Sequence, residues 1–179
     1  MENTQEKIKV LLQKGKTFED FLEAYNTFLL MLNSEDGKSR NIWTKKSFEF
    51  LYRSVNRQYF EFTIPKKSGE ERKICAPTKQ LKLVQKKIAQ ILELYYKPNA
   101  FCHGFVTGRS IVTNAEIHTN KNYVLNIDLE DFFPSIKLNR IIKAIENKPF
   151  NFSPEMSKII ARIACKDGGL PQGSPVSPL

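Results

Sequence analysis

The sequence predicts an α+β fold, because segments with helical spacing of apolar residues alternate with two regions of β-strand spacing. Apolar side chains recur at helical spacing in residues 4–14, 17–32, 44–55, 79–96, 134–145 and 153–167. In residues 59–76 and 123–129 they fall instead on every second position, as in strands with one buried face. A chain of 179 residues is about one domain and is long enough to bury a core.

The N-terminal helices are predicted from their boundaries as well as from their apolar faces. Gly15 is expected to end the first helix. Thr17 and Asp20 fit a capping box for the second, in which the Thr hydroxyl accepts a backbone N–H and the carboxylate reaches back. A third helix is expected from about Thr44, with Phe48 on its apolar face. We assign the aromatic side chains of these helices to the core rather than to a surface that stacks on bases.

A change from helical to alternating spacing at Tyr59 predicts a β-hairpin. Two extended runs, 59–64 and 72–76, flank a Ser-Gly turn. The cations near its tip are Lys66, Lys67, Arg72 and Lys73. Such a tip is suited to phosphates, with Arg as a fork and Lys as a point charge. A solvated basic turn explains the composition equally well.

A strongly amphipathic helix is expected over residues 79–96, followed by a glycine-punctuated loop, 101–110. Ser110 can cap a short helix that runs to about His118. The two histidines, His103 and His118, have no metal-ligand partners in the sequence. We therefore assign them to structural or nucleic-acid contacts.

The most informative stretch is 122–135, where a strand is expected to end in acidic residues. Its alternating apolar side chains are Tyr123, Leu125, Ile127 and Leu129. Asp128 falls on the other face near the end of the strand, although acidic residues are depleted in strands. A divalent metal in an open cleft is one reason for a carboxylate there. The plainer alternatives are solvation of a sheet edge and capping of the next helix.

Two further helices and a loop complete the predicted elements. Pro134 fits the first turn of one helix, and Ser153–Pro154 begins another that stops at Gly168–Gly169. Residues 170–179 contain several prolines and are expected to form a rigid loop.

The composition favours a polyanionic partner. Lys and Arg number 28 against 19 Asp and Glu, which gives a net charge of +9, and nucleic acid is the commonest partner of such a chain. The three cysteines form no Cys-x-x-Cys pair, so we expect neither a zinc site nor a disulfide framework. The N-terminus is polar and no apolar run approaches the roughly 20 residues of a membrane span, so we expect a cytoplasmic protein without a signal peptide or membrane segment.

Taken in order, these segments resemble the reverse transcriptases, most closely the bacterial retron type and next those of group II introns. The motifs that carry the resemblance are Arg72–Pro77 with Leu81, Lys82 and Gln85; His103–Ile111 with Asn114, Ala115 and His118; Asn126–Ile136; and Gly169–Pro175. The first two are similar to fingers motifs, the third to palm motif A and the fourth to motif B. The resemblance implies a right-hand polymerase, with an N-terminal helical region (1–58), fingers (59–121) and a partial palm (122–179).

The resemblance also implies roles for residues of motif A. Asp128 matches the aspartate that binds both catalytic Mg²⁺ ions, and the backbone carbonyl of Leu129 would be a further ligand. Two such ions activate the attacking primer hydroxyl and stabilise the leaving group. Backbone amides of Asp131 and Phe132 would meet the triphosphate. Phe133 matches the steric gate that excludes ribonucleotides, although it could equally be a core residue, and Asp131 a helix cap.

Other implied contacts come from the fingers and from motif B. Lys66 and Arg72 would bind the incoming nucleotide, and Gln172 would contact that nucleotide and the template side of the pocket. Gln172 could instead be a hydrogen-bonding loop residue. The remaining residues that the resemblance places near nucleic acid are Lys67, Lys73, His103, Arg109 and Asn114.

One departure from the family pattern matters. The family requires a second palm motif, Tyr-x-Asp-Asp, after motif B, and the sequence contains no Asp-Asp pair. A single carboxylate should not hold two Mg²⁺ ions. The thumb is also absent. We therefore expect these residues to be part of a longer polymerase and to be inactive alone.

The expected function is RNA-directed DNA polymerisation, in which deoxynucleotides extend a primer on an RNA template. A retron-type enzyme would use a structured noncoding RNA, act with an effector protein and serve defence against phage. One alternative is a truncated, non-catalytic protein that binds RNA through basic fingers. Another is a template-independent polymerase of the same family.

Overall fold

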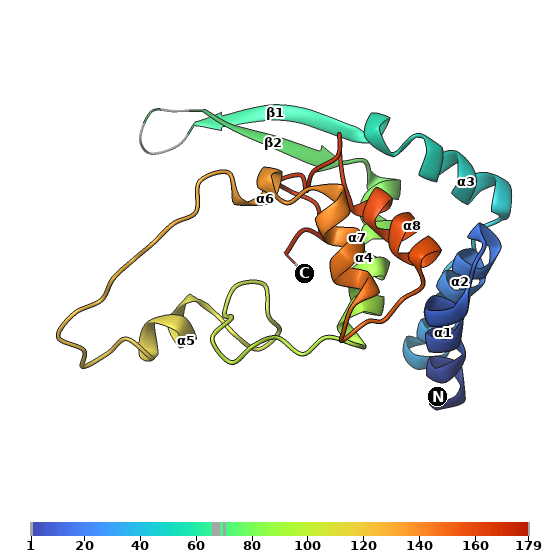
Figure 1. Cartoon of the computed structure of the whole chain (residues 1–179), viewed down its shortest axis with the longest axis horizontal. Coiled ribbons are helices and arrows are strands. Elements are labelled where there is room, and N and C mark those ends of the chain that lie inside the picture. Colours follow the sequence, from blue (N-terminus) through green and yellow to red (C-terminus); the bar gives the residue numbers. More distant parts are fainter. Residues whose placement is uncertain (1, 66–68, 70, 179) are drawn as a thin grey trace.

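The α+β prediction is confirmed by a computed structural model, which describes residues 2–65, 69 and 71–178 (Figure 1). The helices are α1 (Glu2–Lys14), α2 (Phe18–Asp36), α3 (Lys45–Arg53), α4 (Lys79–Glu93), α5 (Ile111–Glu116), α6 (Phe132–Ser135), α7 (Leu138–Glu146) and α8 (Pro154–Ala164). The strands are β1 (Tyr59–Pro65) and β2 (Glu71–Pro77), and the 3₁₀ turn Val55–Arg57 joins α3 to β1. No helix in the described ranges is long and apolar enough to cross a bilayer.

The predicted starts of the second and third helices are confirmed. The backbone N–H of Asp20 donates to Thr17 Oγ1 at 3.1 Å, and Asp20 Oδ2 accepts from the backbone N–H of Thr17 at 2.9 Å. At the start of α3, Thr44 Oγ1 accepts the backbone N–H of Ser47 at 3.3 Å. These bonds satisfy N–H groups that have no partner within a helix.

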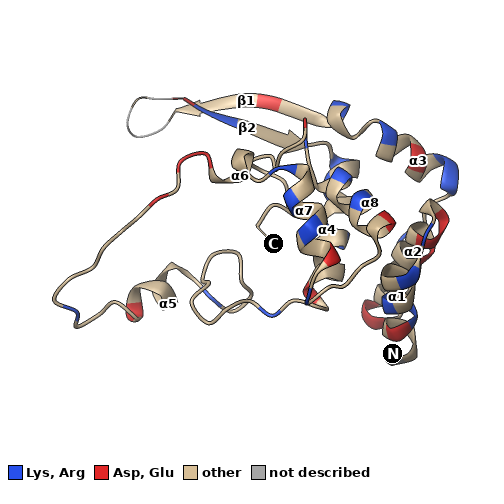
Figure 2. Ribbon diagram, in the orientation of Figure 1, with Lys and Arg blue, Asp and Glu red and all other residues tan. Residues whose placement is uncertain are grey.

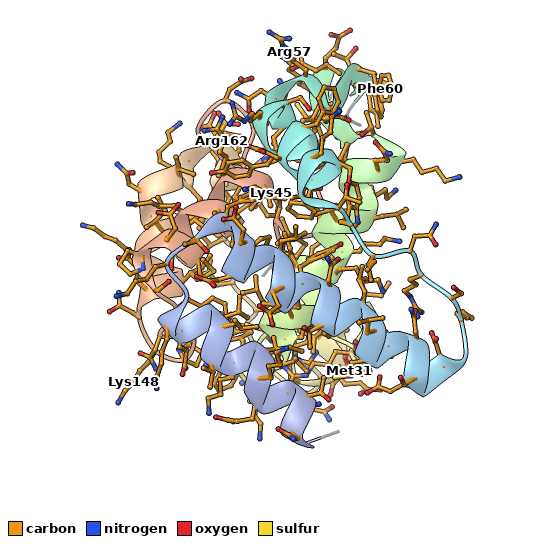
Figure 3. The ribbon with its side chains drawn as sticks, turned by 90° about the vertical axis from the view of Figure 1, so that its right-hand side faces the viewer. Met31, Lys45, Arg57, Phe60, Lys148 and Arg162 are labelled. Carbon is orange, nitrogen blue, oxygen red and sulfur yellow. The ribbon has the colours of Figure 1, made fainter. Side chains whose placement is uncertain are left out.

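The core lies between the N-terminal helices and the α4/α8 pair. Helix α2 packs against α1, α3, α4 and α8 (Figure 3). The buried ring of Phe48 lies 5.2–5.9 Å from the rings of four neighbours: Phe18, Phe21, Tyr25 and Trp43. Arg162 of α8 lies 5.0 Å above the ring of Tyr52 in α3. The assignment of these aromatics to the core is confirmed, and their burial holds the helical region together.

The hairpin is antiparallel and projects from the helical body (Figure 1). Its register pairs Tyr59 with Pro77 at the base and Pro65 with Glu71 towards the tip. The predicted strands are therefore confirmed. Lys66 and Lys67, which we expected at the basic tip, lie outside the described residues.

The strand predicted over residues 123–129 is wrong. This segment is extended but forms no strand, and its side chains are exposed, with Tyr123 at 94%, Leu125 at 84% and Ile127 at 80%. In the part of the chain that the structure describes, the sheet consists of β1 and β2 only. Alternation is a local property, whereas a strand needs a neighbour for its backbone hydrogen bonds, and no described segment supplies one.

Several predicted helix ends are also corrected. Helix α4 ends at Glu93 and α8 at Ala164, both earlier than expected. The helix expected from Pro134 is divided into α6 and α7, because Ile136 is extended with φ −80° and ψ 101°. Ile136 accepts a backbone hydrogen bond from Leu170, so a distant segment draws this residue out of the helical path.

Candidate functional site

The loop after α8 is attached to β2 through its backbone. The N–H of Cys75 donates to the carbonyl of Gln172 at 3.0 Å. Gly173 follows with φ +110°, and a Cβ at this position would lie 3.2 Å from the carbonyl oxygen of Cys75. A residue without a side chain is needed for this close approach. Gln172 is therefore held beside the hairpin.

The same loop is also attached to the chain between α6 and α7. The N–H of Leu170 donates to the carbonyl of Ile136 at 3.2 Å, and the N–H of Leu138 donates to that of Gly168 at 3.0 Å. Three parts of the sequence thus meet: the end of the motif A region, the motif B loop and strand β2. None of these pairings follows from a local sequence pattern, because the paired segments are far apart in the chain.

An ion-pair cluster joins the hairpin to the turn that precedes this loop. Glu61 of β1 pairs with Lys166, and also with Lys73 of β2 at 2.6 Å. Lys166 further contacts Asp167 at 2.9 Å. The two ammonium groups, Lys166 first, lower the pKa of Glu61 to about 2, and the hydrogen bond that Lys166 donates to Glu61 raises the pKa of Lys166. No sequence pattern predicted this cluster, because the strands and the turn after α8 are far apart in the chain.

Residues 131–133 form the entry to α6. Asp131 is the N-cap by position, with φ +48° and ψ 35°, but its side chain makes no capping hydrogen bond. Asp131 thus occupies the helix-cap position that the sequence offered as an alternative, without a capping hydrogen bond from its side chain. The ring of Phe133 packs against the core, and its centroid lies 5.6 Å from that of Phe132. Phe132 is more exposed, at 47%.

Asp128 and Leu129 lie on the extended segment that leads to α6, where Figure 2 shows acidic residues. Both side chains are exposed. Within the described ranges, no group of three His, Cys, Asp or Glu side chains could hold a metal ion. The described residues do not fit a complete Mg²⁺ site, because hard cations need several oxygen ligands.

Arg109 and His103 of the second fingers motif form hydrogen bonds within their own region of the chain. Arg109 Nη1 donates to the carbonyls of Asn99 and Ala100 at 2.5 and 3.3 Å. His103 Nδ1 lies 2.9 Å from Thr113 Oγ1. Asn114 is exposed on α5. Figure 1 shows this loop and α5 well apart from the hairpin, so the structure does not bring them to Arg72 and Lys73, which are exposed on β2.

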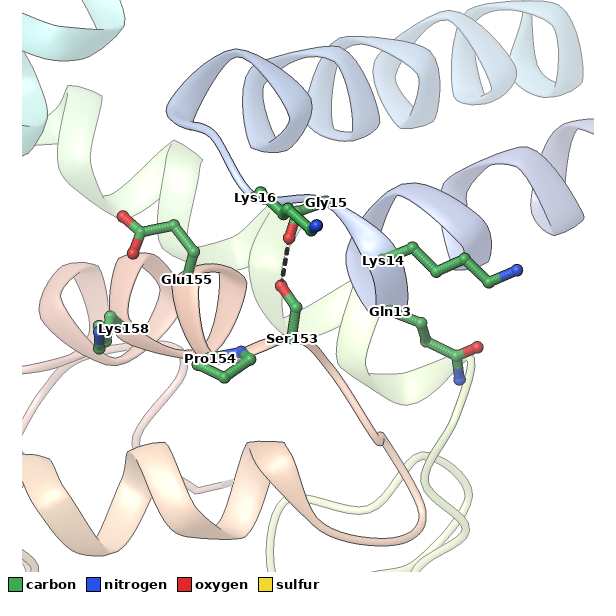
Figure 4. A pocket seen from close by; sticks show the side chains of 8 residues that line it. All are labelled: Gln13, Lys14, Gly15, Lys16, Ser153, Pro154, Glu155 and Lys158. Atoms are coloured by element: carbon green, nitrogen blue, oxygen red, sulfur yellow. Dashed lines mark hydrogen bonds between the residues drawn. The ribbon is translucent and has the colours of Figure 1, made fainter.

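A separate cavity of about 470 Å³ lies where the α1–α2 connection meets the start of α8 (Figure 4). The side chains that line it include Lys14, Lys16, Glu155 and Lys158. Ser153 Oγ donates to the carbonyl of Gly15 across it. None of the predicted site residues lines this cavity.

The β2 strand of the hairpin, the motif A segment and the motif B loop all lie within one region that matches a known family. The family model described as reverse transcriptase (RNA-dependent DNA polymerase) matches residues 64–179. The chain belongs to the reverse transcriptase family.

Known relatives are retron reverse transcriptases. The Retron Ec86 reverse transcriptase of Escherichia coli is 32% identical over 165 residues, which are 87% of this chain and 51% of the relative. The Retron Se72 reverse transcriptase of Salmonella heidelberg (strain 579083-10) is 32% identical over 131 residues, or 72% of this chain and 34% of the relative. The Retron Mx65 reverse transcriptase of Myxococcus xanthus is 41% identical over 85 residues, or 48% and 20%. The resemblance to the retron type is confirmed, and the chain spans about half the length, or less, of these curated relatives.

Proposed function

We propose that this chain is the fingers and first part of the palm of a retron-type RNA-directed DNA polymerase. The observation that carries the proposal is the meeting of β2, the motif A region and the motif B loop in a chain that belongs to the reverse transcriptase family. The substrates would be an RNA template, a primer and deoxynucleoside triphosphates. A structured noncoding RNA and an effector protein would be the further partners, and the protein would act in the cytoplasm in defence against phage.

The site roles follow from the same proposal. Asp128 and the carbonyl of Leu129 would contribute oxygen ligands to Mg²⁺, and further ligands would have to come from outside the described residues. Phe133 would be the gate against ribonucleotides, and Gln172 would meet the incoming nucleotide. The exposed apolar side chains of residues 123–127 would be covered in the complete palm. The chain alone would therefore be inactive.

The experiment is template-directed incorporation of deoxynucleotides by the full-length protein. Asp128→Asn should abolish incorporation while leaving thermal stability unchanged, because the side chain is exposed and makes no described ion pair. Glu130→Gln is the matched control, since it neutralises a neighbouring exposed carboxylate and should retain activity. Incorporation by Asp128→Asn at the wild-type rate would refute the assignment. Salt-sensitive RNA binding without incorporation on any template would favour the non-catalytic alternative.

The gate assignment has its own test. Phe133→Ala should raise incorporation of ribonucleotides relative to deoxynucleotides, because the ring would no longer lie under the sugar. Phe132→Ala is the control, since the neighbouring ring is more exposed. Unchanged discrimination in Phe133→Ala would leave this residue with a packing role only.

A further inference from the structure

A buried polar side chain interrupts the apolar face of α4. Gln85 is 0% exposed and lies among buried apolar residues of the same helix, including Leu81, Val84 and Ile88. A buried amide is stable only when its donors and acceptor have partners. The burial of Gln85 therefore has to be explained by the hydrogen bonds of its amide.

The amide of Gln85 joins three other elements. Nε2 donates to the hydroxyl of Tyr59 at the start of β1 and to the carbonyl of Ile163 in α8, both at 2.8 Å. Oε1 accepts from Ser174 Oγ at 2.9 Å, within the motif B loop. Both N–H groups and the oxygen of the amide are used. Burial raises the pKa of Tyr59 to about 12.

Ser174 carries this contact into the loop itself. Its Oγ also accepts the backbone N–H of Val176 at 3.4 Å. Ser177 Oγ donates to the carbonyl of Pro171 at 2.9 Å. This bond joins the two ends of the segment that contains Gln172. The loop is thus held from inside by Gln85 and from the hairpin by Cys75.

We propose that Gln85 is a positioning residue that fixes the motif B loop through Ser174 and so keeps Gln172 in register with β2. The anchoring of the loop stands on these hydrogen bonds alone. Its consequence for the incoming nucleotide rests on the proposed function, in which Gln172 meets that nucleotide.

The chemistry of the site requires an amide at position 85. A glutamate would lose both donors and would place a charge in the core. A methionine of similar size would fill the space but leave the carbonyl of Ile163 and the hydroxyls of Tyr59 and Ser174 without their partner. Gln85→Met therefore removes the polar contacts with little change in packing volume.

The first experiment measures amide hydrogen exchange in this chain. The reporter is the N–H of Cys75, whose acceptor is the carbonyl of Gln172. Gln85→Met should speed its exchange about tenfold or more, the change expected for a lost hydrogen bond, while amides within α2 exchange as before. Gln90→Met is the control, because Gln90 is an exposed glutamine on the same helix.

Ser174→Ala is the milder variant: it removes the hydrogen bonds of Ser174 to Gln85 and to the N–H of Val176, and it leaves Gln85 bound to Tyr59 and Ile163. It should speed exchange of the Cys75 amide in the same direction, and it decides the matter if Gln85→Met fails to fold. Unchanged exchange at Cys75, or an equal increase throughout α2, would overturn the proposal, since the first shows no anchoring and the second shows only a general loss of stability.

The second experiment measures steady-state kinetics of the full-length polymerase. Ser174→Ala should raise the KM for deoxynucleotides about threefold to tenfold with a smaller change in kcat, because a displaced Gln172 weakens nucleotide binding. An unchanged KM together with faster exchange at Cys75 would overturn the nucleotide consequence and leave the anchoring intact. Absence of polymerase activity in the wild type would count against the proposed function, whereas the exchange result would still decide the role of Gln85.

Discussion

Substitution of Gly173 tests how closely the motif B loop is held against β2. A Cβ on Gly173 would lie 3.2 Å from the carbonyl oxygen of Cys75 and 3.4 Å from Cγ2 of Ile74. Gly168, in the turn before this loop, offers a matched control. It also has positive φ, +82° against +110°, but a Cβ there would meet nothing within 4 Å.

The cost of positive φ applies to both variants, whereas the steric contact with Cys75 applies only to Gly173→Ala. An alanine at positive φ destabilises the fold by about 1–2 kcal/mol, and this applies to both positions. The contact with Cys75 adds about 1–3 kcal/mol at Gly173 only, because a backbone carbonyl in a paired strand cannot rotate away. The difference between Gly173→Ala and Gly168→Ala should therefore be about 1–3 kcal/mol. For a chain of this size, each kcal/mol lowers Tm by about 2–4 °C.

The assay is urea and thermal denaturation followed by circular dichroism. Gly173→Ala should unfold at lower urea and lower temperature than Gly168→Ala, with the same dependence on denaturant concentration. Equal destabilisation of the two variants would refute the reasoning, because the loop would then not be packed closely on the strand.

Three further outcomes are expected. Because Lys166 and Lys73 lower the pKa of Glu61 from 4.5 to about 2, their stabilising effect is complete above pH 4.5 and is lost as the pH falls towards 2. Glu61→Gln should flatten the pH dependence of the urea midpoint in that window, and an unchanged slope would contradict the ion pairs. Phe48→Ala should lower the free energy of unfolding by about 3–5 kcal/mol, whereas Phe50→Ala, at an exposed site of the same helix, should stay within about 0.5 kcal/mol. Thr17→Ala should cost about 0.5–2 kcal/mol through loss of the α2 cap, and an effect near zero in thermal unfolding would show that the capping box is dispensable.

The elements predicted with most success are those whose signals are local. The capping box at Thr17 is a short-range pattern, and the structure contains it with both hydrogen bonds. The antiparallel hairpin also follows from alternation around a turn, and its register joins residues 59–65 to 71–77. Both need only neighbouring residues, so the sequence carries enough information to specify them.

The errors occur where distant segments decide the backbone. Residues 123–129 alternate as a strand does, but alternation supplies no partner for the backbone N–H and C=O groups. The helix expected from Pro134 is divided because Ile136 bonds to Leu170. In the first case the local preference for a strand lacks a partner, and in the second a tertiary contact overrides the local preference for a helix.

For the candidate site too, some features can be predicted from the sequence and others cannot. The motifs in the sequence single out Asp128, Phe133 and Gln172 and the order in which they occur. Gln85 also carries a sequence signal, a polar side chain on an otherwise apolar helix face, but its partners cannot be read from spacing.

The sequence by itself determined the α+β class, the helix caps, the hairpin and the family motifs, because each is encoded within a few neighbouring residues. Only the tertiary structure decided that the motif B loop is held between β2, Gln85 and the segment before α7. The reason is physical: hydrogen bonds between segments far apart in the chain depend on how the helices pack, and packing is a property of the whole fold rather than of any one stretch.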